Sequence, residues 1–452
     1  MNTARLLIAA ATLGLAAPAV AVAQQQPHQT VALTLGDAVR LAARQAPLAE
    51  SARFRAEQAR ARVGQRRADL LPNVSASALR YGRTFNTATL GIEFPTAPGQ
   101  RPFFDPRGEI QGPVVTTDLR ARASLNVLDL AAIARVRAAR SAATASAREA
   151  DAAAEAAAAQ AAAAYLRALR ADAQLRARAQ DSSLAAELLL IAREQLRAGT
   201  GTALDVTRAE AQRAGVRAQL IAARSELARS RLDVLRALAL PLDADLVLVD
   251  SLEALAVDSG ATDPDAATAH ALSTRPDLRA AEEQLAAARR QIRAVQAERL
   301  PTLGAFGDDG AIGKSSNRLL NTYGWGVQVI LPVFDGLRRE GRIEEQRAVA
   351  AEVDVRRRDL VAQAGVEVRA AILDLGAARE QVDAARERLR FSEQEVSQAR
   401  ERFAAGVGGN AEVVTASLGL TAARNQLLDA LTLYQSARVA LARAEGEARS
   451  IR

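Results

Sequence analysis

The chain has 452 residues, 49% of them apolar, and a formal net charge of +7, yet it holds only 9 phenylalanines, 4 tyrosines and 1 tryptophan. The lack of cysteine excludes disulfides, thiolate zinc sites, cysteine nucleophiles and a lipidated N-terminal cysteine, and two histidines leave little material for histidine catalysis or metal clusters. Arginine and glutamate are interspersed, as at Arg386-Glu387-Arg388, which is typical of solvated helix faces. We therefore expect no catalysis, no cofactor or metal and no nucleic-acid binding.

The N-terminus has the pattern of an export signal. Arg5 precedes an apolar run over residues 6–20, and Ala21-Val22-Ala23 places small residues before Gln24. This pattern predicts a signal peptide over residues 1–23. A membrane anchor is the weaker alternative, because about 15 apolar residues are fewer than the roughly 20 that span a bilayer. No later apolar stretch is as long, so any further membrane crossing would need a closed β-barrel.

The remaining chain divides into two similar halves, residues 24–250 and 251–452. Short stretches of the first half recur in the second in the same order, at offsets of 229, 206 and 207 residues. They are Leu70-Leu71-Pro72 with Arg299-Leu300-Pro301, residues 125–129 with 331–335, and residues 193–206 with 400–413. Constant order and nearly constant spacing predict an internal duplication.

Each half is predicted to contain a pair of strands, at about 73–86 and 115–128 and at about 302–307 and 321–334. Polar and apolar residues alternate in the second strand of each pair, so each strand has one apolar face. The connection inside the first pair is long and rich in proline and glycine. Amphipathic antiparallel strands with long loops are typical of transmembrane β-barrels, and four strands cannot close one, so several chains must contribute.

Long helical hairpins follow the strands, at 130–240 and 336–449. Their first helices would be roughly 100 Å long. In the second hairpin an apolar residue recurs every seven positions, at Val413, Leu420, Leu427, Tyr434 and Leu441, and only Arg213 breaks the matching series in the first. This spacing predicts coiled coils. The alanine runs within 152–164 are either simple helix formers or small residues that let helices pack closely, and we favour the second interpretation.

The signal peptide, the duplication, the strand pairs, the turns at Gly199 and Gly406 and the stretch LPVFDGLRR at 331–339 together resemble the TolC-like outer membrane efflux proteins. The resemblance covers about residues 31–447. It implies a mainly α fold with a small β-barrel: a homotrimer whose twelve strands form a barrel in outer membrane lipid, continuous with a coiled-coil α-barrel in the periplasm. It also implies a passive exit duct that works with a periplasmic adaptor and an inner-membrane pump.

The resemblance places adaptor docking and a gate at the hairpin tips. The tip residues are Gly199, Gly201, Asp205, Gly406, Gly408 and Gly409. In the family, two acidic positions three residues apart can form rings at the constriction; here Glu412 matches the first, but Thr415 occupies the second. A Glu412 ring would favour cations, and an equally weighted alternative is a helix N-terminal acid stabilised by the helix dipole. That alternative is stronger for Asp205.

Two further interpretations follow. Tyr323 and Trp325 are candidates for an aromatic girdle at the membrane interface, with ordinary packing as the alternative. The competing function is a periplasmic adaptor or coiled-coil scaffold, since such proteins also use long hairpins. Adaptors usually carry one hairpin with β-rich modules, whereas this chain has two hairpins joined to amphipathic strands, which favours the channel.

Overall fold

The computed structural model describes residues 30–90, 108–255, 263–315 and 317–451. The predicted signal peptide, residues 1–23, and most of the long proline-rich loop of the first half lie outside the described residues. None of the described helices is both long and apolar enough to cross a membrane.

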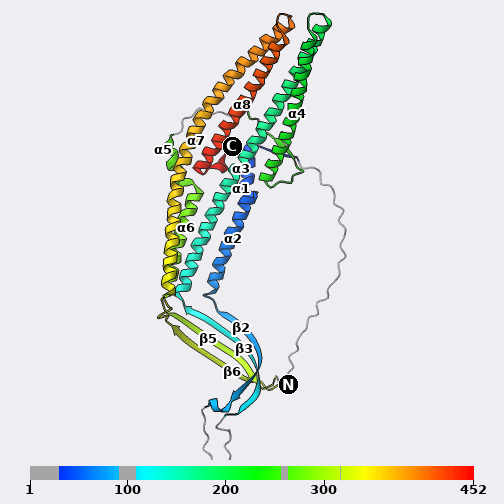
Figure 1. The fold of residues 1–452 in the computed structure, drawn as a ribbon. Coiled ribbons are helices and arrows are strands. Elements are labelled where there is room, and N and C mark those ends of the chain that lie inside the picture. The colour runs from blue at the N-terminus through cyan, green and yellow to red at the C-terminus, as the bar shows by residue number, and fades with distance from the viewer. Residues whose placement is uncertain (1–29, 91–107, 256–262, 316, 452) are drawn as a thin grey trace, which may run out of the picture.

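The described elements repeat in the order expected for two similar halves. The first half contains β1 (Thr30–Leu33), α1 (Leu35–Gln45), α2 (Pro47–Ala68), β2 (Asn73–Asn86), η1 (Thr87–Leu90), β3 (Ile110–Leu128), α3 (Leu130–Arg197), α4 (Ala203–Ala237) and β4 (Asp245–Leu248). The second contains α5 (Pro264–Thr274), α6 (Pro276–Ala297), β5 (Thr302–Gly313), β6 (Leu320–Ile330), α7 (Arg338–Ala404), α8 (Asn410–Glu445) and η2 (Ala448–Ser450). The helices form an elongated bundle, with the sheet at one end and the two hairpin tips at the other (Figure 1).

A proline breaks the first helix of each half at the same place. Pro47 and Pro276 occupy the first turns of α2 and α6, where the missing N–H leaves no hydrogen bond unmade. Proline disfavours the helical conformation at the residue before it, and Ala46 and Arg275 have extended ψ angles of 143° and 122°. Each half therefore has a short helix followed by a long one that runs to the sheet.

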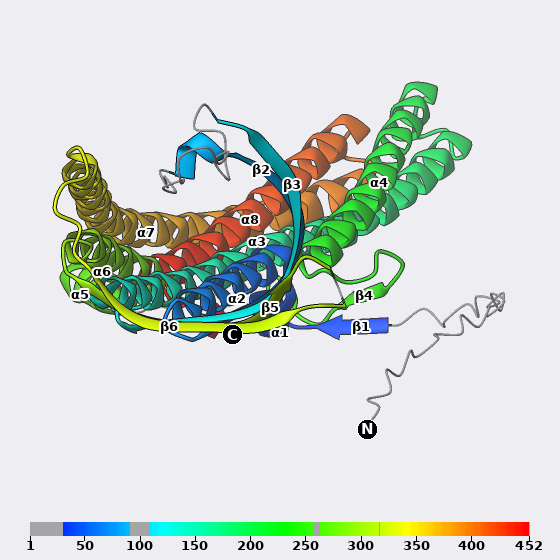
Figure 2. The same cartoon turned by 90° about the horizontal axis from the view of Figure 1, so that it is seen from below.

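The sheet is antiparallel, with strand order β2-β3-β5-β6, and it curves strongly (Figure 2). Paired residues of adjacent strands point to the same face, and Trp325 pairs with Gly307, which pairs with Ala123. That face is apolar at most positions. The opposite face carries Arg120, whose guanidinium is hydrogen-bonded to Asp308. The sheet thus has one apolar and one polar surface, as the sequence alternation predicts.

Three strand boundaries differ from the sequence predictions. β3 begins at Ile110, before the expected 115, and β5 continues to Gly313, past the expected 307. The glycines of β5 weaken the strand pattern in the sequence, so the extension was not predicted. They are needed because the backbone of β3 lies close by: a Cβ on Gly310 would lie 2.4 Å from the Leu119 carbonyl oxygen. β6 ends at Ile330 and not at 334, because Pro332 has no N–H to donate to a neighbouring strand.

Another boundary differs at the start of the second hairpin. α7 begins at Arg338, two residues after the predicted 336, because Gly336 and Leu337 have positive φ angles of 71° and 65°. This left-handed conformation cannot continue a right-handed helix.

The main core lies in the middle of the bundle and is built largely from alanine. Ala158 and Ala162 of α3 are fully buried, and the largest buried side chains there are Tyr165 and Tyr434. The alanine run of α3 therefore packs closely against other helices, as we favoured from the sequence. Small side chains permit short distances between helix axes, so many weak contacts replace a few large side chains.

One buried tyrosine joins the beginning and the end of the first half. The Tyr165 hydroxyl donates to the Leu33 carbonyl (2.7 Å) and lies 3.1 Å from Asp250 Oδ2, which also accepts from Leu35 N (2.7 Å). Burial and the nearby Asp250 carboxylate raise the pKa of Tyr165 well above its usual value, so the hydroxyl remains a donor at neutral pH. β1 pairs in parallel with β4 beside this contact.

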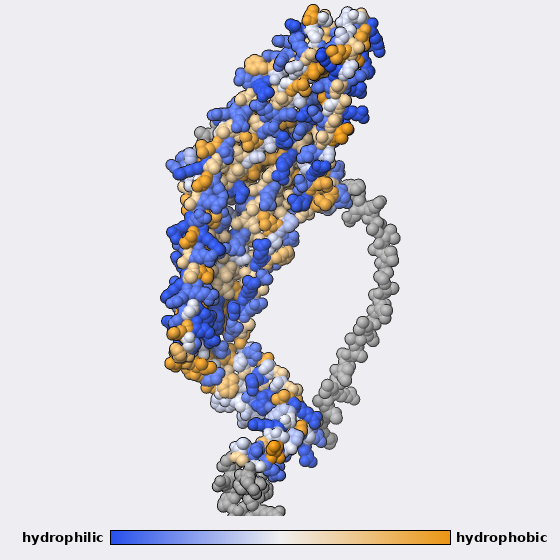
Figure 3. All heavy atoms as spheres, in the orientation of Figure 1, coloured by the Kyte–Doolittle hydropathy of each residue, from blue (hydrophilic) through white to orange (hydrophobic). Residues whose placement is uncertain are grey.

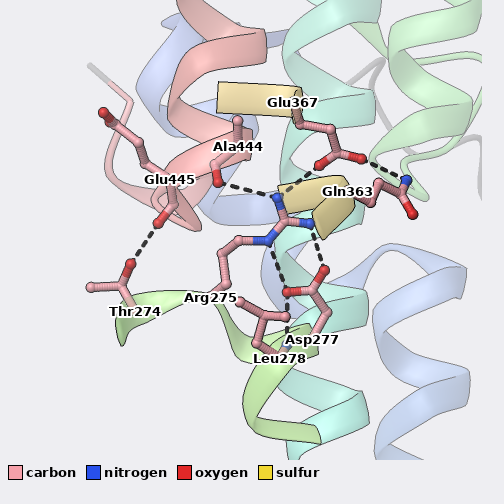
Figure 4. Close-up of polar contacts among 8 residues, drawn as sticks. All are labelled: Thr274, Arg275, Asp277, Leu278, Gln363, Glu367, Ala444 and Glu445. Atoms are coloured by element: carbon pink, nitrogen blue, oxygen red, sulfur yellow. Dashed lines mark hydrogen bonds and ion pairs between the residues drawn. The ribbon is translucent and has the colours of Figure 1, made fainter. Parts of the chain in front are cut away.

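A buried arginine fixes the break between α5 and α6 (Figure 4). Arg275 donates to Asp277 Oδ2 (2.7 Å), to Glu367 Oε2 of α7 (2.7 Å) and to the Ala444 carbonyl of α8 (3.3 Å). Its side chain is only 8% exposed. Thr274 Oγ1 beside it donates to the Glu445 carbonyl (2.7 Å). One side chain thus holds together the ends or flanks of four helices.

Candidate functional site

The tip of the first hairpin is closed by a Schellman turn followed by a capping box. Gly199 has a φ of 76°, and the Thr200 N–H donates to the Gln195 carbonyl (3.0 Å) while the Gly199 N–H donates to the Leu196 carbonyl (3.1 Å). Asp205 accepts from both the hydroxyl (2.6 Å) and the N–H (3.2 Å) of Thr202, which caps α4. The Asp205 carboxylate is therefore already used in forming the helix start.

The second tip repeats the turn but not the cap. Gly406 has a φ of 72°, and the Val407 N–H donates to the Arg402 carbonyl (3.0 Å), in the same geometry 207 residues later. The position that matches Thr202 is Gly409, which has no side chain to cap α8. Glu412 consequently has no capping-box partner and is free to pair elsewhere.

Glu412 pairs with an arginine of its own hairpin. Arg402 Nε of α7 lies 3.3 Å from Glu412 Oε1 in the first turn of α8, and both side chains are about half exposed. The Thr415 hydroxyl, one turn later, donates to the Ala411 carbonyl (2.9 Å). The two expected gate residues, Glu412 and Thr415, thus lie one turn apart on α8. Glu412 is the acidic one, and its ion-pair partner Arg402 belongs to the same hairpin tip.

Two hydrogen bonds connect one tip to the other. The Gln195 side chain donates from Nε2 to the Phe403 carbonyl (2.6 Å), and Asn410 Nδ2 donates to the Asp205 carbonyl (2.7 Å). Asn410 is only 1% exposed. A small apolar cluster lies behind these bonds, formed by Leu188, Leu189, Ala192, Ala209, Val396, Ala399, Phe403, Val413, Ala416 and Leu420. The two tips therefore form one unit.

Farther from the tips, a buried carboxylate joins α3 to α8. Asp181, whose side chain is 6% exposed, lies 3.2 Å from Arg178 Nη1 and 2.9 Å from Arg424 Nη1, and accepts from the Thr421 hydroxyl (3.1 Å). Arg178 also donates to Asn425 (3.2 Å). Since Arg178 and Asp181 belong to the first hairpin and the others to the second, this network links the hairpins.

The turn glycines permit a direct test. Replacing Gly406 by alanine is expected to cost about 1 kcal/mol, because open space surrounds its Cβ position and only the positive φ opposes a side chain. The opposite sign is expected for Gly376→Ala inside α7, where a Cβ also meets nothing and alanine is the better helix former. The unfolding midpoints of the two variants should lie on opposite sides of the wild type; shifts in the same direction would contradict the assigned turn.

The aromatic candidates lie at the far end of the molecule. Tyr323 and Trp325 belong to β6 and are 75% and 79% exposed, on the same face as Val327 and Val329. The structure brings them together with other apolar side chains of the sheet and separates them from the hairpin tips by the full length of the helices (Figure 1).

Sequence reasoning missed the side chains that connect helices at the tips and between the hairpins. Arg402, Gln195 and Asp181 have no distinctive local motif, and their roles depend on a contact with the other helix. One signal was available: the 207-residue repeat places Gly409 opposite Thr202, which shows that the second cap lacks a hydroxyl. Within the ranges that the structure describes, no group of three or more metal-ligating side chains comes together.

A family model and one curated relative cover nearly the whole chain. The model described as "Outer membrane efflux protein" matches residues 38–240 and 268–447. Protein CyaE of Bordetella pertussis is 27% identical over 458 residues, which cover 96% of this chain and 88% of the relative.

Solved structures share the fold. The outer membrane channel CmeC of Campylobacter jejuni has a TM-score of 0.72 at 20% identity, over 92% of this chain and 86% of that chain. The open state of the outer membrane channel MtrE of Neisseria gonorrhoeae has a TM-score of 0.72 at 19% identity, over 91% of this chain and 88% of that chain. A membrane protein from Pseudomonas aeruginosa has a TM-score of 0.75 at 22% identity, over 91% and 93%.

Proposed function

Because the chain belongs to the outer membrane efflux protein family, we propose that it forms the outer membrane duct of a tripartite efflux pump or a type I secretion system. It is a protein of the outer membrane that extends into the periplasm, and its relatives are channels, not enzymes. The observation that carries the proposal is the arrangement of an amphipathic sheet at one end of a long helical bundle and a paired set of hairpin tips at the other. Membership of this family argues against the adaptor alternative.

Three copies would complete the structure. One chain contributes four strands, too few to close a barrel, and twelve strands from three chains would place the apolar face, with Trp325 and Val327, against lipid. The opposite face, with Arg120 and Asp308, would line the pore. Tyr323 and Trp325 would then lie at a membrane interface, where aromatic side chains are favoured.

Assembly and conductance test this function together. Protein extracted from membranes in a mild detergent should run as a trimer and produce single-channel currents in planar lipid bilayers. A monomer without conductance would contradict the proposal, as would release of the protein from membranes by carbonate.

The tips are the proposed gate and adaptor-docking site. An open groove of about 430 Å³ lies near the tip between α3 and α4, lined by Leu189, Arg193, Glu210, Arg213, Arg217 and Ile221 among others. It offers an adaptor both apolar and charged contacts. The turns beside this groove carry few side chains, because five of their residues are glycine: Gly199, Gly201, Gly406, Gly408 and Gly409.

Arg402 sets the charge of the proposed gate. It lies 3.3 Å from Glu412, so each acidic charge at a trimeric constriction is accompanied by a basic one from the same chain. A ring of three such pairs attracts cations far less than three free carboxylates. We therefore propose an entrance that is nearly neutral.

The ion selectivity of the channel checks this arrangement. Arg402→Gln leaves Glu412 without its counter-charge and is expected to raise the ratio of cation to anion permeability a few-fold, measured as the reversal potential in a salt gradient. Glu412→Gln should shift the reversal potential in the opposite direction, and the double variant should resemble the wild type. Equal reversal potentials in all four proteins would place these residues away from the constriction.

A further inference from the structure

Exposed apolar side chains gather where the sheet meets the helices. Val333 and Phe334, which follow β6, are 87% and 79% exposed, Leu71 before β2 is 62% exposed, and Val127 at the end of β3 is 57% exposed. Figure 3 shows hydrophobic residues at this lower end of the bundle, next to hydrophilic ones on the adjoining helices. The apolar face of the sheet is therefore continued by an apolar band in the connections between the strands and the helices.

Arginines concentrate immediately beyond this apolar band. We define the junction collar as residues 60–71, 129–140, 289–300 and 335–347, the helix ends next to the sheet. It contains 15 arginines and seven acidic residues, an excess of 8, which is one more than the net charge of +7 of the whole chain. The hairpin tips, residues 187–210 and 394–417, contain five arginines and seven acidic residues. The positive charge is therefore concentrated at the membrane end of the helices.

Most acidic residues of the collar are already paired. Glu298 pairs with Arg342 (2.7 Å), and Glu340 with Arg299 (3.0 Å), while Asp129 and Asp335 also have arginine partners. Asp69, Glu344 and Glu345 form no ion pair among the described residues. Eleven exposed arginines likewise have no ion-pair partner in the described part of the chain: Arg60, Arg62, Arg66, Arg67, Arg137, Arg140, Arg289, Arg290, Arg293, Arg338 and Arg347.

From this arrangement we infer that the junction collar binds the phosphate groups of anionic phospholipids in the periplasm-facing leaflet. The inference rests on the proposed insertion of the sheet in the outer membrane, which brings the collar level with that leaflet's head groups. Guanidinium groups bind phosphate oxygens through paired hydrogen bonds. Arg60, the farthest collar arginine on α2, is eight residues before Ala68, about 12 Å along the helix. Arg66 and Arg67 are within two residues of Ala68, about 3 Å along the helix, so their unpaired guanidinium groups lie within side-chain reach of the apolar band.

A lipid titration tests the inference on the purified full-length protein. Phosphatidylglycerol added to the protein in neutral detergent should raise its thermal unfolding midpoint more than phosphatidylcholine does. In the collar variant the apparent dissociation constant for phosphatidylglycerol should rise about tenfold. That variant combines Arg66→Gln, Arg67→Gln, Arg290→Gln and Arg293→Gln. A matched control, in which Arg53, Arg55, Arg224 and Arg229 are replaced by glutamine, removes the same number of exposed, unpaired arginines away from the sheet and should bind like the wild type.

The inference would be overturned by equal effects of the two lipids, by an unchanged affinity in the collar variant, or by the same stabilisation with inorganic phosphate alone. A lower affinity in the control variant to the same degree would also overturn it, because net charge alone would then explain binding. Single-channel recording on the same samples separates the two proposals. Wild-type trimers that conduct but do not distinguish the lipids contradict only the collar, whereas protein that neither inserts nor conducts contradicts the proposed channel.

Discussion

Replacing Arg275 by methionine should lower the free energy of unfolding by about 2–3 kcal/mol, somewhat less than the about 3–5 kcal/mol typical for breaking a fully buried ion pair. Methionine fills a similar volume but leaves the carboxylates of Asp277 and Glu367 without their shared partner. Those carboxylates are 35% and 32% exposed, so water compensates part of the loss. The Ala444 carbonyl at the end of α8 also loses a donor.

The thermal unfolding midpoint of the trimer measures this loss, which should amount to several degrees. Arg275→Lys should fall between the wild type and Arg275→Met, because an ammonium group can pair with one carboxylate at a time. Arg279→Ala on the same helix is the matched control. Arg279 is exposed, and among the described residues its side chain donates only to the Ser273 carbonyl (2.7 Å), so its removal should change the midpoint little. An equal decrease of the unfolding midpoint in Arg275→Met and Arg279→Ala would contradict the stabilising role assigned to the buried contacts of Arg275.

The Arg275 site also predicts a pH dependence. Burial alone would raise the pKa of Asp277, but the hydrogen bonds and the charge of Arg275 lower it by more, so the pKa lies below its ordinary value. A carboxyl group with a lowered pKa stabilises the fold above its unfolded pKa of about 3.9, and this stabilisation disappears as the pH falls through the folded value. Arg275→Met should flatten the dependence of stability on pH in this acidic range.

The helical part of the fold could be predicted closely because the sequence patterns that mark helices and their ends are local. Glycines with positive φ end α3 and α7 where the sequence places turns, and the seven-residue series finds buried residues at Val413, Leu420 and Tyr434. A second buried series three positions later was missed: Ala416, Ala423, Ala430 and Ala437. Alanine is as common on exposed helix faces as in tight interfaces, so its spacing carries little hydrophobic signal.

The sheet and the site were harder to predict for a different reason. Glycines in β5 weaken its strand signal, and only the backbone of the adjacent β3 explains why Gly310 must lack a side chain. At the tips, the sequence identified Glu412 but could not show that Arg402 pairs with it, since that contact depends on how the turn between them closes. Contacts between the two hairpins, such as Asn410 with Asp205, come from tertiary packing that no local pattern encodes.

Replacing Asp181 by alanine is expected to weaken the link between the hairpins, with a loss of about 3–5 kcal/mol in the free energy of unfolding. The variant leaves Arg178 and Arg424, which are 10% and 22% exposed, without a carboxylate between α3 and α8. Two cations of like charge would then repel each other across the interface between the hairpins. Asp172→Ala is the matched control, because Asp172 pairs with Arg176 within α3 (3.0 Å) and should contribute at most about 1 kcal/mol.

The Asp181 variant also tests whether the link between hairpins keeps the proposed gate narrow. Beyond Asp181, the tips are held by Gln195 with Phe403 and by Asn410 with Asp205, two hydrogen bonds that together are worth only about 1–3 kcal/mol. Once the buried network is lost, those bonds and the small apolar cluster behind them still oppose separation of α3 from α8, but the total resistance is smaller. The single-channel conductance of Asp181→Ala should therefore exceed that of the wild type. Adding Gln195→Ala should increase it further. A lower unfolding midpoint with unchanged conductance would assign Asp181 to stability alone and place the constriction elsewhere.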